Sequence, residues 1–328
     1  NMVAVSESTP GPIGVNMATY VGFELGGVPG AVVATLGLVA PSIVVILIIA
    51  QFLKAFRNSK YVDRAFYGVR PASTALIAAA SSASALETSV KPLVTELGVD
   101  HPATGLFVGN SYSFYNCGIH GYVRGFTRET KTPWKARLQT ISSGMLAWHN
   151  VKNYLSEHEM DPYVKPGTQK MFDVVFLQGM SSEPIDPKRA GTYRKYLKQH
   201  VETVREAGSV PIVVVTWAKQ NKMEETRALA DSIITEANRN HAIALPVGLA
   251  FAESLKERPD LILHQADKSH PTAAGSYLYG AMIYSLLYKK SPEGLKYLGE
   301  CEKPLKPEDA AFLQGVAWRV MKDFYGWN

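Results

Sequence analysis

The feature that most constrains this chain is a long apolar stretch near its beginning. No charged residue occurs between Leu25 and Leu53, and about 20 apolar residues suffice to cross the roughly 30 Å of hydrocarbon in a bilayer. The stretch therefore predicts a transmembrane helix, with a buried core helix as the alternative. A second uncharged segment, Pro71 to Leu86, is shorter and is a marginal span.

The segment between these two stretches is basic. It contains a single acidic residue, Asp63, against five basic ones, Lys54, Arg57, Lys60, Arg64 and Arg70. Short basic loops of this kind stay in the cytoplasm. We expect 71–86 to return the chain across the membrane, which places the remainder outside the cytoplasm. The alternative is that 71–86 stays on the cytoplasmic surface and leaves the remainder in the cytoplasm.

Composition excludes several classes of protein. With 46% hydrophobic and 19% charged residues the chain is neither disordered as a whole nor, at a mean hydropathy of -0.04, a membrane bundle along its full length. The net charge of +5 is dispersed over the second part of the chain, so a nucleic-acid partner is not expected. Cys117 and Cys301 allow at most one intrachain disulfide, and whether they pair is left open.

From Thr104 onward, short apolar runs alternate with amphipathic stretches. This alternation predicts a parallel sheet covered by helices. Helical spacing of apolar residues marks 188–207 and 224–238 as helices. Five strands are expected, at 105–109, 137–142, 173–178, 211–217 and 242–247. The fold class predicted is therefore α/β, doubly wound around a five-stranded parallel sheet and preceded by an apolar helical segment.

Reactive groups in such a fold belong in the loops at the carboxyl ends of the strands. Ser111 follows the first expected strand, and Asp267 and His270 lie beyond the fifth. A serine hydroxyl becomes a nucleophile when a histidine takes its proton, and a carboxylate orients that histidine. These three residues form a candidate catalytic set, although Ser111 and Asp267 would also serve as turn or helix caps.

Three sequence blocks together resemble the SGNH (GDSL-like) hydrolase superfamily over about residues 103–290. Gly109-Asn110-Ser111 is similar to its nucleophile block, and Asp267-Lys268-Ser269-His270-Pro271 to its Asp-x-x-His-Pro block. The third block contains Gln178-Gly179, at the end of the expected strand 173–178. The resemblance implies a flavodoxin-like three-layer sandwich and a serine hydrolase without a cofactor.

The same resemblance suggests further site residues. It implies that the Ser111 and Gly144 amides and the Gln178 side chain hold the oxyanion. Gln178 is included because Gln178-Gly179 is similar to the Gln-Gly pattern of the carbohydrate-acetylesterase-like branch of the superfamily. Gly144 is almost as well explained as a tight-turn glycine. Substrate-cleft positions are expected at Asn110, Tyr112, Met180 and Trp217, although Trp217 is as readily a packing residue. His149 and His264 lack a third ligand, so no metal site is expected.

The beginning of the chain resembles a different family. The run Ser6 to Gly22, with Gly30-Ala31, Ala34 to Gly37, Pro41-Ser42 and Gly68 to Pro71, is similar to chromate transporters over about residues 3–85. Those proteins have several membrane helices per half, whereas at most two or three are expected here and the sequence starts at Asn1. We therefore expect a transporter remnant that serves at most as an anchor.

These inferences define the expected organisation and function. Residues 1–86 form a transporter-like membrane fragment, 87–102 a linker and 103–328 the hydrolase domain. The expected activity is hydrolysis of carboxylic esters, with a small molecule or a carbohydrate ester as substrate. The alternatives are a transporter-family fragment with an appended domain and a non-catalytic binding domain on an SGNH scaffold.

Overall fold

The computed structural model describes residues 19–37, 40, 86–156, 170–299 and 303–327. The chain divides into two compact units, Asn1–Ala83 and Ser84–Asn328. Most of the predicted spans 25–53 and 71–86 lie outside the described residues, as does Cys301.

The described part of the first unit, Thr19–Gly37, is a helical segment that turns back on itself. Its length and composition make it a candidate membrane span. The Thr19 and Thr35 hydroxyls, however, are 2.6 Å apart, whereas a straight helix would separate these residues by about 24 Å. Gly27 makes the turn possible with a left-handed φ of 60°. Within the described residues, this segment is thus a helical hairpin, and 25–37 does not form part of one straight spanning helix as the sequence predicted.

The second unit is built on a five-stranded, wholly parallel sheet of order β2-β1-β3-β4-β5. The strands are β1 (Thr104–Gly109), β2 (Lys135–Thr140), β3 (Val174–Leu177), β4 (Val210–Val214) and β5 (Ile243–Leu245). The doubly wound α/β prediction is confirmed, and the ends of individual strands differ from the expected ones by at most three residues. The strand order reverses between β1 and β3, and a ligand site is expected at the carboxyl ends of the strands beside that point.

The central strands are buried on both faces, as their unbroken apolar sequences require. Every residue of β3 is buried, and so are the last five of β1. Phe107 and Phe176 occupy paired positions on these strands, and their rings stack at 4.5 Å. This pair fixes the register of β1 against β3, the two strands that carry the turns described below.

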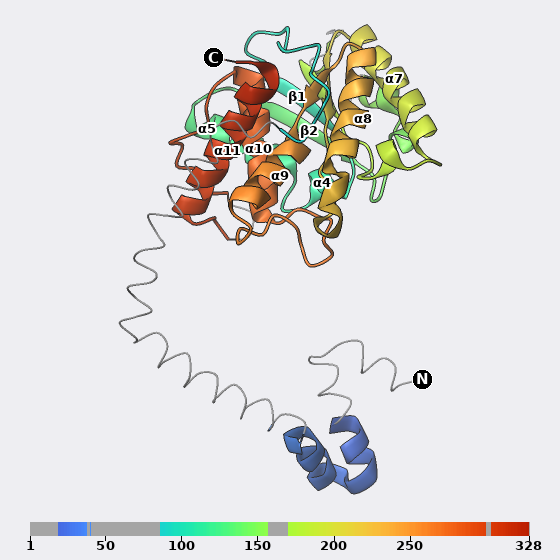
Figure 1. Cartoon of the computed structure of the whole chain (residues 1–328), viewed down its shortest axis with the longest axis vertical. Coiled ribbons are helices and arrows are strands. Elements are labelled where there is room, and N and C mark those ends of the chain that lie inside the picture. Colours follow the sequence, from blue (N-terminus) through green and yellow to red (C-terminus); the bar gives the residue numbers. More distant parts are fainter. Residues whose placement is uncertain (1–18, 38–39, 41–85, 157–169, 300–302, 328) are drawn as a thin grey trace. The chain divides into compact units, whose positions relative to one another are not determined.

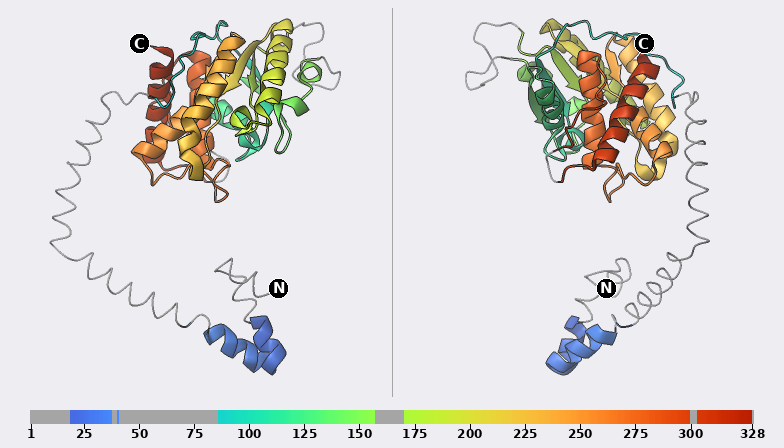
Figure 2. Two further views of the ribbon diagram at one scale, coloured as in Figure 1. Left: turned by 45° about the vertical axis from the view of Figure 1, so that its right-hand side comes forward. Right: turned by 90° about the vertical axis from the view of Figure 1, so that its left-hand side faces the viewer.

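Helices cover both faces of the sheet (Figure 1). On one side lie α7 (Ala190–Glu206) and α8 (Thr226–Arg239), and on the other α5 (Ile119–Glu129), α9 (Val247–Glu257) and α10 (Ala273–Tyr288). Helix α11 (Pro307–Tyr325) packs on α10, and Figure 2 shows the two side by side. Because α10 is enclosed between these neighbours, its residues from Ala274 to Leu287 are all buried, without a polar stripe. Short helices, α4 (Ser111–Phe114), α6 (Val151–Tyr154), η1 (Leu146–Trp148), η2 (Glu183–Ile185) and η3 (Gln220–Glu225), occupy the loops.

Residues 86–102, most of which were expected to form a linker, run along the surface of the second unit without regular secondary structure. The Thr88 and Ser89 hydroxyls donate to the Asp231 carboxylate on α8, at 2.6 and 2.5 Å. Further along, the Trp327 indole N–H donates to the Thr95 carbonyl at 3.1 Å. These contacts tie the segment to α8 and to the end of α11, and we call residues 86–102 the strap.

Candidate active site

The turn after β1 places Ser111 at the start of a short helix. Asn110 is the N-cap of α4: its backbone is extended, and its side-chain oxygen accepts the Tyr112 N–H at 3.1 Å. The cap satisfies one of the amide groups that a helix start leaves unpaired. The Ser111 side chain, on the first residue of the helix, remains partly exposed at the carboxyl end of the sheet.

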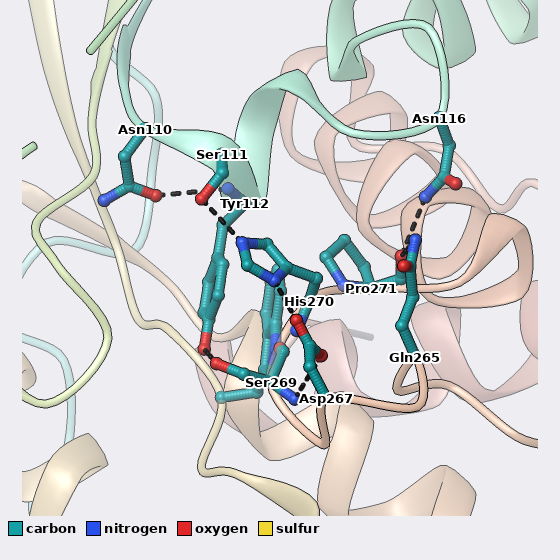
Figure 3. A network of polar contacts seen from close by, with 10 residues as sticks. Asn110, Ser111, Tyr112, Asn116, Gln265, Asp267, Ser269, His270 and Pro271 are labelled. Carbon is teal, nitrogen blue, oxygen red and sulfur yellow. Dashed lines mark hydrogen bonds and ion pairs between the residues drawn. The ribbon is translucent and has the colours of Figure 1, made fainter. Parts of the chain in front are cut away.

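The structure brings Ser111, His270 and Asp267 together, although 159 residues separate the serine from the histidine (Figure 3). The Ser111 Oγ lies 2.8 Å from His270 Nε2. The other ring nitrogen, Nδ1, contacts Asp267 Oδ2. Because the carboxylate accepts a hydrogen bond from the Nδ1–H group, Nε2 carries no proton and is left as an acceptor for the serine hydroxyl.

The Asp267 carboxylate is held by its own turn. Its Oδ1 accepts the N–H groups of Ser269 and His270 at 2.9 and 3.0 Å. Partial burial raises the pKa of Asp267, but the hydrogen bond from the His270 side chain and those from the two N–H groups outweigh it and lower the pKa to about 2. The carboxylate is therefore ionised throughout the neutral range and available to orient the imidazole.

Asn110 connects three turns beneath Ser111, and at 2% exposure it is not the cleft residue that was expected. Its Nδ2 donates to the carbonyls of Gly144, after β2, and Gly179, after β3, at 3.1 and 3.2 Å. Its Oδ1 accepts a hydrogen bond from Gln178 Nε2 at 2.8 Å as well as the one from the Tyr112 N–H. All four hydrogen-bonding positions of the amide are occupied.

Gln178 was expected to donate to an oxyanion, but the structure uses both of its amide protons elsewhere. Nε2 donates to Asn110 Oδ1 at 2.8 Å and to the Gly179 carbonyl at 3.0 Å, while Oε1 accepts the Ser113 hydroxyl at 2.7 Å. The side chain is 2% exposed. It packs so closely under β1 that a Cβ at position 109 would lie 2.6 Å from its Oε1, which explains Gly109. Gln178 thus supports the turn that carries Ser111 from below.

The Gly144 N–H, the second expected oxyanion donor, closes a turn by donating to the Ile141 carbonyl at 2.8 Å. Its carbonyl accepts from Asn110. Gly144 therefore fits the tight-turn interpretation. No hydrogen bond among the described residues uses the Ser111 N–H, which leaves this group as an available donor beside the Ser111 hydroxyl.

Two of the expected cleft residues lie behind the histidine turn. Trp217 is 1% exposed and stacks between Tyr112 and Phe251 at 4.4 and 4.3 Å. Its Nε1 donates to the Ser269 carbonyl at 3.0 Å, and the Tyr112 hydroxyl lies 2.7 Å from the Ser269 hydroxyl. Both rings therefore hold the Asp267–His270 turn rather than line a cleft. Met180 is partly exposed, as a cleft residue would be.

Three other titratable groups near these loops are buried. Burial and, secondarily, the nearby His200 lower the pKa of His149 to about 4, so it is neutral at pH 7. His264 Nε2 lies 3.0 Å from the Ala218 carbonyl, and burial lowers the pKa of His264 too. Burial raises the pKa of Glu183, whose Oε2 accepts the Met180 N–H at 3.1 Å. Among the described residues, no three His, Cys, Asp or Glu side chains form a metal-binding group.

Sequence reasoning missed several residues that hold this site. Tyr115 and Asn116 contact the histidine turn from the end of α4, and Ser269 receives the contacts of Tyr112 and Trp217. Ser269 could have been noticed, because it lies inside the Asp-x-x-His block. Nothing in the local sequence of Tyr115 or Asn116 signals a partner more than 150 residues away.

Residues 1–115 match the chromate transporter family model. The matched range exceeds the resemblance over 3–85 and runs into β1 and α4 of the second unit. A curated relative, the uncharacterized transporter YwrA of Bacillus subtilis, is 34% identical over 71 residues, which are 22% of this chain and 40% of that protein. The chain thus spans about two fifths of the length of this relative.

The second unit is similar to solved structures. A DUF4886 family protein from Bacteroides uniformis superimposes with a TM-score of 0.53 at 15% identity, covering 66% of this chain and 93% of that one. A variant of Axe2, an acetyl xylan esterase from Geobacillus stearothermophilus, gives a TM-score of 0.45 at 14% identity, covering 58% and 96%. At these identities the first likeness shows a shared fold; function has to be argued from the site.

Proposed function

We propose that the second unit is a serine hydrolase that cleaves carboxylic esters. The observation that supports this most directly is the chain of contacts from Ser111 Oγ, 2.8 Å from His270 Nε2, through the imidazole to the Asp267 carboxylate. A non-catalytic binding domain would have no need for a serine, an oriented histidine and an ionised carboxylate in this order.

In the proposed mechanism the Ser111 oxygen attacks the acyl carbon while His270 Nε2 takes its proton. The resulting imidazolium returns that proton to the departing alkoxide, and an acyl-enzyme remains. Water then attacks the acyl carbon, with His270 again as base, and releases the acid and free Ser111. The Ser111 N–H is the proposed main-chain donor to the oxyanion, and Asn110 and Gln178 keep the turn that presents it in place.

The experiment that tests this proposal is labelling with a fluorophosphonate, which reports an activated serine whatever the natural substrate is. The wild-type chain should be labelled, and Ser111→Ala should not. Labelling at a different serine, or none at all, would contradict the proposal. The narrower suggestion of acetyl groups on carbohydrate rests on the resemblance at Gln178-Gly179, and a faster turnover of acetyl than of longer acyl esters would support it.

The family match over residues 1–115 favours a second, separate role for the first unit. We propose that it attaches the chain to a membrane and that the hydrolase lies outside the cytoplasm, as the basic residues between 54 and 70 suggest. Digestion of the second unit by protease added to sealed cells would support this placement. Protection until lysis would favour the cytoplasmic side, and a full-length protein that is monodisperse without detergent would contradict membrane attachment.

A further inference from the structure

The aromatic ring of Tyr115 lies face to face against the imidazole of His270. The ring centroids are 4.2 Å apart and the planes differ by 15°. Tyr115 directly follows α4, and its N–H donates to the Ser111 carbonyl at 2.9 Å. The residue stacked on the histidine is therefore tied, through the backbone, to the serine that the histidine serves.

We propose that Tyr115 is a positioning residue whose ring face stabilises the protonated imidazole of His270 during acyl transfer. The inference rests on the proposed function, because only a reaction that moves the serine proton onto His270 creates that charge. The π face of an aromatic ring carries partial negative charge and attracts a cation placed over it. A neutral imidazole gains less from the same contact, so the stack favours the charged form.

Residues other than Tyr115 hold the backbone of the histidine turn. Asn116 Nδ2 donates to the Pro271 carbonyl at 2.9 Å, and Gln265 Nε2 donates to the same oxygen at 3.1 Å (Figure 3). On the other side, Trp217 donates to the Ser269 carbonyl at 3.0 Å. Since the backbone on both sides of His270 is held by other residues, removal of the Tyr115 ring should change the surroundings of the imidazole while the turn stays in place.

Few other groups face this imidazole. Asp267 contacts it from its own turn, and Ser111 contacts it from α4. Tyr112, also on α4, meets the ring at 75° with centroids 5.8 Å apart. Lys268 lies in the same turn, and no contact between its ammonium group and the imidazole is found among the described residues. Among these groups, the Asp267 carboxylate and the stacked face of Tyr115 are therefore the ones placed to stabilise a positive charge on His270.

The test is the rate of fluorophosphonate labelling as a function of pH. In this reaction the serine oxygen forms a bond to phosphorus, fluoride leaves, and the serine proton moves to His270. Tyr115→Leu removes the ring, and Tyr115→Phe keeps the stack without the hydroxyl. Phe114→Leu is the matched control, because Phe114 is the preceding residue and its side chain is 60% exposed.

For Tyr115→Leu we expect the acid limb of the profile to move to lower pH by about half a unit and the plateau rate to fall about two- to fivefold, as expected from the loss of one partly exposed cation–π contact. Tyr115→Phe and Phe114→Leu should retain the wild-type midpoint. A packing role alone would lower the plateau without moving the midpoint.

Each contrary outcome has its own meaning. An unchanged midpoint in Tyr115→Leu would overturn the inference and leave the proposed function intact, whereas a wild-type chain without labelling would overturn both. Equal losses in Tyr115→Phe and Tyr115→Leu would assign the effect to the hydroxyl and also overturn the inference. A direct NMR titration of the His270 ring, in the Ser111→Ala background with and without Tyr115→Leu, gives the same comparison independently of the rate.

Discussion

Asn110 and Gln178 share a buried hydrogen bond of 2.8 Å directly beneath the nucleophile turn. Through this bond the turn after β1 is joined to the end of β3, and Asn110 extends the connection to Gly144 after β2. The amide pair therefore sets the relative positions of three loops at the point where the strand order reverses. Its role is to hold the serine in place, and neither side chain is free to contact substrate.

Ser111→Ala and His270→Ala should each abolish nearly all turnover of any ester that the wild type cleaves. Because the serine and its base act as a unit, we expect a fall of about 10⁴- to 10⁶-fold in kcat. Circular dichroism should show an unchanged fold. A Ser111→Ala variant that retains more than about a tenth of the activity would rule out Ser111 as nucleophile, since that loss is below about 1.4 kcal/mol of barrier.

Gln178→Ala should lower stability and kcat together. It leaves the Ser113 hydroxyl and one Asn110 acceptor position without their buried partner, so we expect a loss of about 2–3 kcal/mol in the free energy of unfolding. Urea unfolding and labelling rates should be measured on the same samples. The matched control, Ser113→Ala, removes only one of the partners of Gln178 and should cost about 1 kcal/mol. Unchanged stability with a large drop in kcat would instead restore Gln178 as an oxyanion donor.

His149 should make the second unit less stable in mild acid. Its folded pKa of about 4 lies below its ordinary value of 6.5. Between these values only the unfolded chain binds the proton, so stability falls as the pH drops from 6.5 towards 4. The loss at pH 5 should be about 2 kcal/mol.

Urea unfolding of the wild type and of His149→Gln at pH 7 and pH 5 measures this effect. The variant cannot take up the proton, so its loss between the two pH values should be smaller. His241→Gln, at an exposed position, is the control and should behave as the wild type. Equal losses in His149→Gln and the wild type would contradict the assignment.

The strap should detach when Asp231 loses its charge. Partial burial raises the pKa of Asp231, but hydrogen bonds from Ser89 and Thr88 outweigh it, so the net pKa lies below its ordinary value of 3.8. The ionised form is thus favoured in the folded state. Its contribution is present above the ordinary carboxyl range and is lost as the pH falls through the lowered pKa.

Limited proteolysis of the strap detects this detachment. Asp231→Asn should accelerate cleavage within residues 86–102 at neutral pH, whereas Asp323→Asn, an exposed substitution on α11, should not. Cleavage at the same rate in both variants would show that two other hydrogen bonds hold the strap without Asp231: the one from Trp327 to Thr95, and one from the Leu93 N–H to the Asn238 side chain at 2.8 Å.

Much of the fold follows from local sequence patterns. The apolar runs of β1, β3, β4 and β5 and the helical spacing in α7 and α8 specify a covered parallel sheet, because a strand buried on both faces needs an uninterrupted apolar sequence. The candidate nucleophile, base and carboxylate could also be named in advance. Their sequence signals are local: Ser111 directly follows the first strand, and Asp267 and His270 lie three residues apart in one short block.

What only the tertiary structure decided is which polar groups are already engaged. Gln178 and Gly144 have the right types and places for oxyanion donors, yet their amide protons are used by Asn110, Gly179 and Ile141. Trp217 stands at the end of a strand like a cleft wall, yet it is buried between two rings. Most buried donors are paired with an acceptor, and which acceptor lies within reach depends on how distant segments pack. The contact of Tyr115 with His270, which lie 155 positions apart in the sequence, likewise depends on how these distant segments pack.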